Sequence, residues 1–278
     1  ITCPEWPENT SRPVCGLRAS CTPRPGPGAT WTPRIDALAR NSTILESYYV
    51  NPICSPTRAS IMTGRYTIRT GINHHCSGSL TGLPRNQRLL PQAPKEAGYE
   101  TWGFGKWHLG YNESYMLPTS HGFDYHYGFY NAAVDAFNHT QGNNCNASYC
   151  LGLDWHRATY DAASGGTTST YPRDKRYTHT THLLVGELEA RLARRTSAAP
   201  LFVYAAFHMV HEGSGHGALS WPGGFDAGEL QVPPEYVDAV PSTVTDKKRR
   251  VFVAMAALLD EAVGNITAAY VRHGLWAN

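Results

Sequence analysis

One continuous apolar run constrains the fold of this chain more than any other feature. It covers residues 201–207, LFVYAAF, and lies between Pro200 and His208. A strand that is buried on both faces has this pattern, so we expect 201–207 to be an interior strand of a parallel sheet. Residues 246–273 carry apolar side chains at helical spacing, and Gly274 supplies a stop signal. Strands that alternate with helices predict an α/β fold, with a central, mostly parallel sheet flanked by helices.

Weaker patterns predict the other elements. Thr32 and Pro33 are typical of the N-cap and first turn of a helix, here a short amphipathic one. We expect strands at 44–50 and 100–104. Residues 111–180 are rich in Tyr, Asn, Gly and Thr, which predicts surface loops around short elements.

The first 30 residues differ from the remainder in composition. They are rich in Pro, Arg and Cys, and the run TPRPGPG at 22–28 can form neither a helix nor a central strand. We therefore expect 1–30 to be a disordered segment or sequence foreign to the fold, and 31–278 to form the folded domain.

Composition and sequons favour a globular protein of the secretory pathway, lysosomal or extracellular. The chain is 41% hydrophobic with a net charge of +2, which gives no reason to expect a nucleic-acid partner, and no apolar run approaches a membrane span. Of seven cysteines, Cys145 and Cys150 close a short polar loop and form the one disulfide that we predict. N-glycosylation sequons begin at Asn9, Asn41, Asn112, Asn138, Asn146 and Asn265. A cytosolic chain with accidental sequons is the alternative.

The segment CSPTRASIMTGR at 54–65 carries the strongest chemical signal. Cys54 lies at a turn that opens a predicted helix, and helix N-termini bind oxyanions through their free N–H groups. Arg58, four residues later, shares a helix face with Cys54. A nucleophile, a cation and a helix N-terminus therefore meet where an anion could bind. A buried structural cysteine at a helix start is the alternative.

This segment resembles the signature of the sulfatases, C-x-P-x-R followed by T-G-R. The resemblance implies that Cys54 is oxidised to formylglycine by the formylglycine-generating enzyme. A hydroxyl of the hydrated aldehyde would then attack sulfur. It also implies that Arg58 orients and stabilises this nucleophile, and that the formylglycine made from Cys54 is a ligand of a calcium ion.

A second segment, GFGKWHLG at 103–110, also resembles sulfatases. If it is extended, Lys106 and His108 face one side and Trp107 the other. The resemblance implies that Lys106 binds the sulfate of the substrate and that His108 acts near the formylglycine. An exposed lysine and a structural histidine are the alternative.

A third segment, FHMVHE at 207–212, follows the apolar run, where ligand sites of open α/β sheets lie. The resemblance matches His211 to a sulfate-contacting histidine and puts His208 at a variable position. We therefore expect His211 to be more central to the site than His208. Cys54, Arg58, Lys106, His108 and His211 should then converge on one pocket.

The similarity extends from about residue 31 to the end and is greatest to the arylsulfatase B group, the N-acetylgalactosamine-4-sulfatases. It implies an alkaline phosphatase-like sulfatase fold and a sulfated small molecule or glycan as substrate. An insertion around 213–228 leaves the substrate open. Matching segments include the following: 66–71, 89–99, 121–124, 230–233 and 259–264.

The resemblance also implies acidic calcium ligands that the chain does not match. Residues 1–30 contain no aspartate, and the Asp-Asn expected after Asn278 and a second lysine further on have no counterpart. We therefore expect a partial catalytic domain, truncated at both ends, without a complete metal site. The alternatives are a non-catalytic relative that binds sulfated glycans and a phosphodiesterase-like branch of the superfamily. The Cys54 segment argues against the last of these.

Overall fold

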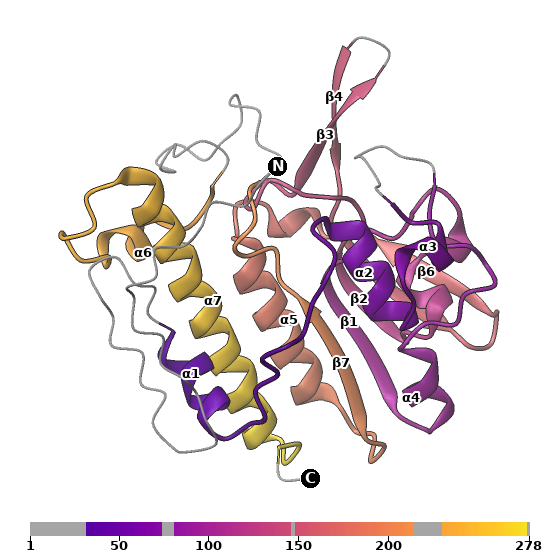
Figure 1. Ribbon diagram of the computed structural model, residues 1–278. Coiled ribbons are helices and arrows are strands. Elements are labelled where there is room, and N and C mark those ends of the chain that lie inside the picture. Colours follow the sequence, from indigo (N-terminus) through magenta and orange to yellow (C-terminus); the bar gives the residue numbers. More distant parts are fainter. Residues whose placement is uncertain (1–31, 74–80, 146–147, 214–229, 277–278) are drawn as a thin grey trace.

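The computed structural model describes residues 32–73, 81–145, 148–213 and 230–276, and it forms a three-layer α/β arrangement (Figure 1). A five-stranded sheet lies in the middle, with α5 and α7 on one face and α2 on the other. The helices of the described residues are α1 Pro33–Arg40, α2 Cys54–Thr63, α3 Thr67–Thr70, α4 Gln92–Glu96, α5 Thr180–Arg194, α6 Pro234–Asp238 and α7 Lys247–Arg272. The strands are β1 Glu100–Lys106, β2 Tyr125–Phe129, β3 Thr140–Cys145, β4 Ser148–Leu153, β5 His156–Asp161, β6 Gly166–Thr170 and β7 Leu201–Ala206. Short 3-10 helices cover Ser114–Met116, Pro118–His121 and Arg173–Lys175.

The sheet has the strand order β6-β5-β2-β1-β7. β1 pairs in parallel with both β2 and β7, whereas β5 and β6 are added antiparallel to one another and to β2. β3 and β4 form a separate hairpin that projects away from the layers (Figure 1). The predicted α/β class is confirmed, with parallel strands where the candidate site residues lie.

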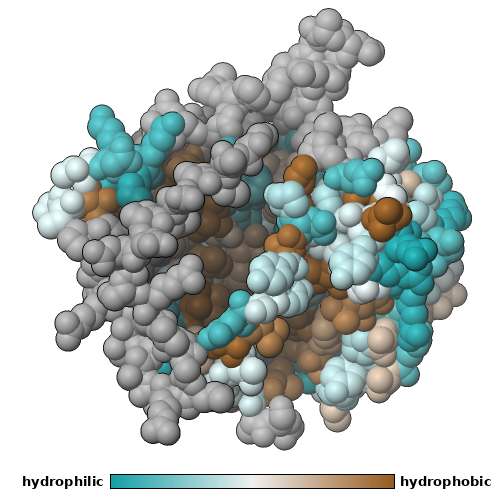
Figure 2. Space-filling view, viewed as in Figure 1, coloured by the Kyte–Doolittle hydropathy of each residue, from teal (hydrophilic) through white to brown (hydrophobic). Residues whose placement is uncertain are grey.

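β7 forms where the apolar run predicts a strand, but its expected interior position is wrong. Among the described residues β7 pairs only with β1 and lies at the edge of the sheet. Leu201, Phe202, Val203 and Tyr204 are half-buried, and Ala205 is exposed. Figure 2 shows hydrophobic side chains at the surface of the molecular face that carries β7. An apolar run reports the propensity to be buried, but it does not say how many neighbouring strands the described chain provides.

Two further expectations about strands are wrong. Residues 44–50 pair with no described strand and are exposed, with Leu45 at 69% and Tyr49 at 87% of full exposure. Residues 111–180 are not mainly surface loops, since they contribute β2, the fully buried central strand. Its sequence YHYGF lacks an aliphatic run, and its tyrosines are nonetheless almost fully buried.

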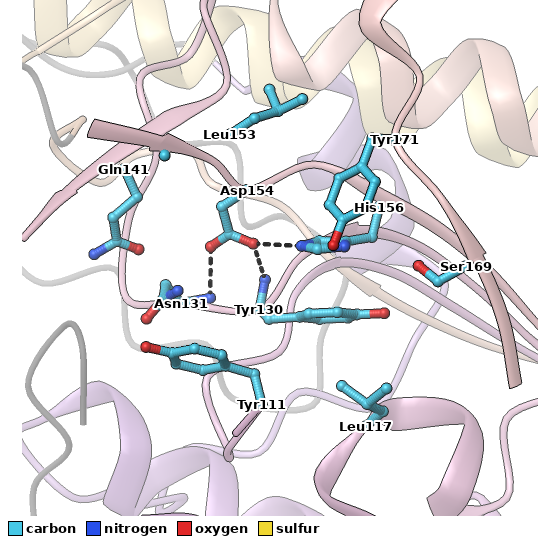
Figure 3. A pocket seen from close by; sticks show the side chains of 11 residues that line it. Tyr111, Leu117, Tyr130, Asn131, Gln141, Leu153, Asp154, His156, Ser169 and Tyr171 are labelled. Carbon is cyan, nitrogen blue, oxygen red and sulfur yellow. Dashed lines mark hydrogen bonds and ion pairs between the residues drawn. The ribbon is translucent and has the colours of Figure 1, made fainter. Parts of the chain in front are cut away.

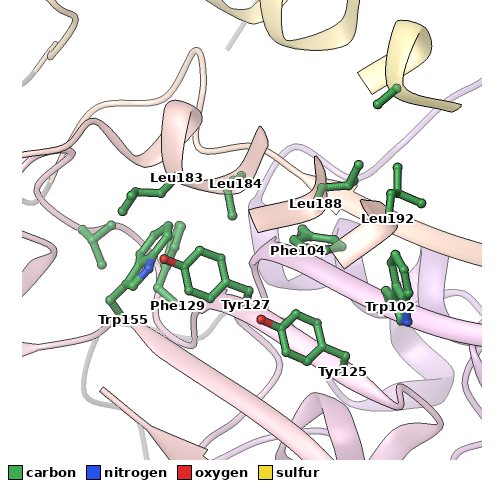
Figure 4. Packing of buried hydrophobic residues seen from close by; sticks show 12 residues of the cluster. Trp102, Phe104, Tyr125, Tyr127, Phe129, Trp155, Leu183, Leu184, Leu188 and Leu192 are labelled. Atoms are coloured by element: carbon green, nitrogen blue, oxygen red, sulfur yellow. The ribbon is translucent and has the colours of Figure 1, made fainter. Parts of the chain in front are cut away.

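The core lies on both faces of the sheet. On one face, aromatic side chains of β1 and β2 pack against leucines of α5, including Phe104, Tyr127 and Leu188 (Figure 4). On the other face, Ala59 and Met62 of α2 pack with Trp107 and neighbouring residues. The two faces therefore hold the ends of β1 and β2 between α5 and α2.

The predicted helices at 33–40 and 246–273 are confirmed, as α1 and α7. α7 has 26 residues and is long and apolar enough to cross a membrane by length and composition, so the sequence expectation of no such run is wrong. In the structure α7 packs against α1, α5 and α6 as a core helix. Its buried Asp260 accepts hydrogen bonds from the N–H groups of Arg34 (2.9 Å) and Ile35 (2.8 Å), which caps α1 from a distant part of the chain.

The expectations for residues 1–30, for Cys145 with Cys150 and for the insertion at 213–228 concern residues or side chains that lie almost entirely outside the described part of the chain.

Candidate functional site

The parallel strands β1 and β2 end together and bring the candidate site residues to one edge of the sheet. Lys106 is the last residue of β1 and pairs in register with Phe129, the last residue of β2. Beyond the strands, the N–H groups of Trp107 and His108 each donate a 3.0 Å hydrogen bond to the carbonyls of Phe129 and Tyr130. This carboxyl-terminal edge is where ligands bind in open α/β sheets.

Close packing of the strands at this edge requires glycine. Gly105 has φ +88, and a Cβ atom placed there would lie 2.0 Å from the carbonyl oxygen of Ala206 in β7. A Cβ atom placed at Gly128 of β2 would likewise lie 2.2 Å from the carbonyl oxygen of Gly105. The glycines let three strand ends approach one another, and they set the backbone of Lys106 beside α2.

Cys54 begins α2, as predicted, and its side chain interacts with that of Lys106. Lys106 is only 3% exposed, and its ammonium group hydrogen-bonds to Cys54. Burial and the nearby Arg58 cation lower the pKa of Lys106 to about 8, while Cys54 acts in the opposite direction. Lys106 is thus buried beside a second cation, and no described carboxylate forms an ion pair with it.

Arg58 joins this pair from the next turn of α2. Its Nη1 donates a 2.7 Å hydrogen bond to the carbonyl of Lys106 and a 3.4 Å one to the hydroxyl of Tyr204. Burial lowers the pKa of Arg58, and the proximity of Tyr204 and Cys54 partly offsets this effect. Two cations therefore flank Cys54 at the N-terminus of a ten-residue helix.

His108 lies at the same edge but not through strand alternation. β1 ends at Lys106, and His108 has φ +57, which is left-handed, so the expectation that Lys106 and His108 share a strand face does not describe this backbone. Both side chains are buried, at 3% and 4% exposure. The side-chain role of His108 stays a prediction.

His208, rather than His211, is the buried histidine after β7. His208 is 4% exposed and stacks with His211 at 5.5 Å between ring centroids, whereas His211 is exposed. Burial, followed by the charges of His211 and Lys106, lowers the pKa of His208 well below 6.5. His208 is therefore the more buried of the two histidines and lies close enough to Lys106 to be affected by its charge, while the role of His211 stays a prediction. The sequence signal for His208 was its position directly after the strand.

The described residues do not fit a calcium site. Nowhere in the described ranges do three or more His, Cys, Asp or Glu side chains form a group that could hold a metal ion. Lys106 and Arg58, the groups that interact with Cys54, are cations, and calcium prefers several oxygen ligands. The chemistry derived below therefore includes no metal-dependent step.

A pocket of about 470 Å³ lies next to this edge, and sequence reasoning missed it (Figure 3). At its centre the Asp154 carboxylate accepts 2.9 Å hydrogen bonds from the N–H groups of Tyr130 and Asn131 and from Nε2 of His156. Its lining residues are Tyr111, Leu117, Tyr130, Asn131, Gln141, Gly152, Leu153, Asp154, His156, Ser169 and Tyr171. Asp154 and His156 begin the return into β5, a position that is visible only when the β2–β5 pairing is known.

The fold and this site define an α/β protein in which a cysteine at a helix N-terminus and two cations meet at the carboxyl edge of parallel strands. Solved structures share the fold. One is the crystal structure of Ps i-CgsB in complex with k-i-k-neocarrahexaose, with a TM-score of 0.67, 24% identity, and coverage of 89% of this chain and 51% of that one. Another is the PsFucS1 sulfatase from Pseudoalteromonas sp., with a TM-score of 0.60, 21% identity, and coverage of 88% and 47%.

The family model named Sulfatase matches residues 19–278. Arylsulfatase J of Mus musculus is 32% identical over 252 residues, which is 89% of this chain and 37% of that protein. N-acetylgalactosamine-6-sulfatase of Mus musculus is 40% identical over 107 residues, or 35% of this chain and 20% of that protein. The chain belongs to the sulfatase family, as its motifs predicted. It spans about a third of the length of the first of these relatives and about half of the first of these solved structures.

Proposed function

We propose that this chain carries the nucleophile half of an enzyme site that hydrolyses sulfate esters. The observation that supports this most directly is the contact of Lys106 with Cys54 at the N-terminus of α2, with Arg58 beside both. Sulfate carries negative charge that grows during cleavage, and preorganised cations stabilise such charge. Membership of the sulfatase family supports the same reaction class.

The nucleophile in this proposal is formylglycine made from Cys54 by a formylglycine-generating enzyme. When hydrated, it would supply one hydroxyl to attack sulfur with departure of the alcohol, and a second whose deprotonation allows sulfate to be expelled. Lys106 binds the sulfate oxygens, and Arg58 holds the start of α2 against the end of β1. His108 and His211 are proposed to contact the departing alcohol and the sulfate, and His208 stays neutral between Lys106 and His211 because its pKa is low.

The proposed substrate is a sulfated glycan, and the proposed location is the secretory pathway, in lysosomes or outside the cell. Relatives named for N-acetylgalactosamine-6-sulfate and a structural neighbour solved with k-i-k-neocarrahexaose support the substrate class. Sequons at the exposed residues Asn41, Asn112 and Asn265 support the location. Calcium remains a family expectation, and the described residues do not supply its ligands.

The test is to co-express the chain with a formylglycine-generating enzyme, and to measure both conversion of Cys54 by mass spectrometry and hydrolysis of an aryl sulfate. We expect conversion, and we expect inorganic sulfate to bind with an affinity that Lys106→Ala reduces at least tenfold. An unconverted Cys54, together with sulfate binding that is unaffected by Lys106→Ala, would refute the proposal. Binding and conversion without any turnover would favour a non-catalytic protein that binds sulfated glycans.

A further inference from the structure

The pocket beside the sulfate site contains aromatic and uncharged polar side chains. Three tyrosines line it, together with the amides of Asn131 and Gln141 and the hydroxyl of Ser169. Among the described residues that line it there is no lysine or arginine. Its volume of about 470 Å³ lies in the range of small-molecule sites, which combine an apolar surface with a few polar groups.

The pocket lies on the same face of the sheet as the helix that carries Cys54. Tyr130 belongs to the buried cluster that includes Ala59 and Met62 of α2, and Tyr111 and Leu117 pack against that cluster. Tyr130 also follows Phe129, the register partner of Lys106, and its carbonyl accepts the hydrogen bond from the His108 N–H. The pocket wall therefore starts one residue beyond the sulfate-binding end of the sheet.

The wall is rigid because the buried Asp154 holds it. Its two carboxylate oxygens accept three hydrogen bonds, which fix the backbone of Tyr130 and Asn131 and the ring of His156 (Figure 3). The Tyr130 ring stacks on the His156 ring at 3.9 Å between centroids. The Tyr171 ring also packs against the His156 ring, at 4.8 Å between centroids. The second ring nitrogen of His156, Nδ1, has no hydrogen-bond partner among the described residues.

We infer that this pocket is a subsite for an uncharged, hydroxyl-bearing ring, a neutral sugar unit attached to the sulfated unit at Lys106. This inference rests on the proposed function for the position of the sulfate. Tyrosine rings offer apolar faces, while amide, hydroxyl and imidazole groups can bond to sugar hydroxyls. Asp154 is a carboxylate that is 5% exposed, and no lysine or arginine among the described residues lines the pocket to pair with a second anion. The subsite therefore selects against a second sulfate or a carboxylate on that unit.

Lactose and inorganic sulfate separate the two sites in a binding experiment on the full chain. Tyr171 is 52% exposed, so Tyr171→Ala can remove a pocket ring with little effect on the core. We expect this change to weaken lactose binding, followed by saturation-transfer NMR, at least fivefold and to leave sulfate binding, measured by calorimetry, unchanged. Tyr171→Phe should keep lactose binding. Tyr99→Ala, a 40% exposed tyrosine that does not line the pocket, should change neither.

Lys106→Ala is the converse test to Tyr171→Ala, because it should abolish sulfate binding and retain lactose binding. Lactose carrying one sulfate should bind more tightly than lactose with a sulfate on each ring. Absence of lactose binding to the unmodified chain, equal lactose binding in Tyr171→Ala, or a preference for the disulfated sugar would each overturn the subsite. Sulfate binding that survives Lys106→Ala would instead count against the proposed function and leave the subsite standing.

Discussion

The guanidinium of Arg58 donates a 2.7 Å hydrogen bond to the main-chain carbonyl of Lys106, so a cation of α2 holds the backbone at the end of β1. The bond links the first turns of α2 to the end of β1. It also helps to explain why the cations of Arg58 and Lys106 can lie close together, because the Arg58 guanidinium donates an N–H to a carbonyl oxygen.

Removal of the hydrogen bond between Arg58 and Lys106 should lower both the stability of the fold and the affinity for sulfate. Arg58→Ala leaves the Lys106 carbonyl and the Tyr204 hydroxyl without their donor, and we expect the free energy of unfolding to fall by about 1.5–3 kcal/mol. Arg85→Ala is the matched control, because Arg85 pairs with Glu113 at the exposed surface and its loss should cost less than about 1 kcal/mol. Urea titrations of both variants measure the difference; equal losses would contradict a structural role for Arg58.

Sulfate binding should weaken as the pH rises through about 8. The pKa of Lys106 is lowered to about 8 by burial and by Arg58, so its charge is present below that value and lost above it. A bound sulfate stabilises the charged form and moves the apparent midpoint upward. Calorimetry of sulfate binding between pH 6 and about 10 checks this, because exposed lysines titrate near 10.4. A flat profile across pH 8 would show that Lys106 does not hold the anion.

Gly105→Ala should be far more damaging than a glycine substitution elsewhere. The new Cβ would meet the Ala206 carbonyl at 2.0 Å, and the residue would have to keep φ +88. We expect loss of the native β1–β7 contact and a large drop in the thermal midpoint. Gly186→Ala is the control, because Gly186 lies within α5 with open space around its Cβ position, and this change should stabilise by about 0.5–1 kcal/mol.

Asp260→Ala should release α1. Asp260 is 1% exposed and accepts bonds from the N–H groups of Arg34 and Ile35. We expect a loss of about 2–3 kcal/mol in the free energy of unfolding, with faster proteolysis around α1. Asp238→Asn changes an exposed carboxylate and should have little effect. A normal rate of proteolysis in Asp260→Ala would argue that apolar packing alone holds α1.

Glycans should be found at some sequons and not at others in protein secreted from a eukaryotic host. Asn138 is 3% exposed, and its N–H bonds to Asp135 at 2.6 Å, so a glycan there is incompatible with the fold. Asn41, Asn112 and Asn265 are exposed. Glycopeptide mass spectrometry should therefore detect occupancy among these three and none at Asn138. A glycan on Asn138 of folded protein would contradict the packing of that segment.

The sequence predicted those parts of the fold and site that depend on local pattern. The helix from Lys247 to Arg272, two of the parallel strands, β1 and β7, and the opening of a helix at Cys54 follow from apolar spacing and turn residues. The motif also identified Lys106 and Arg58, which the structure brings together with Cys54.

Other parts of the fold and site depend on packing partners that a local sequence pattern does not identify. The run at 201–207 indicates burial but not edge or centre, and Ile44 and its neighbours look like a strand although no described edge pairs with them. The central strand YHYGF was missed because its burial comes from aromatic packing rather than from aliphatic residues. The Asp154 pocket was missed because its wall is assembled from the residues just after β2, the β3–β4 hairpin, the start of β5 and the end of β6.

The second contact of Arg58 has a consequence for the order of events during synthesis. Tyr204 lies 146 residues after Arg58, and Lys106 lies 48 residues after it, so the ribosome must synthesise β7 before Arg58 can make both contacts. Contacts this distant in sequence form late and slowly. Until then Arg58 lacks its Tyr204 contact, and the residues around Cys54 are not yet held in their final places. A modifying enzyme that acted on this thiol would therefore have its best access before β7 has emerged and docked.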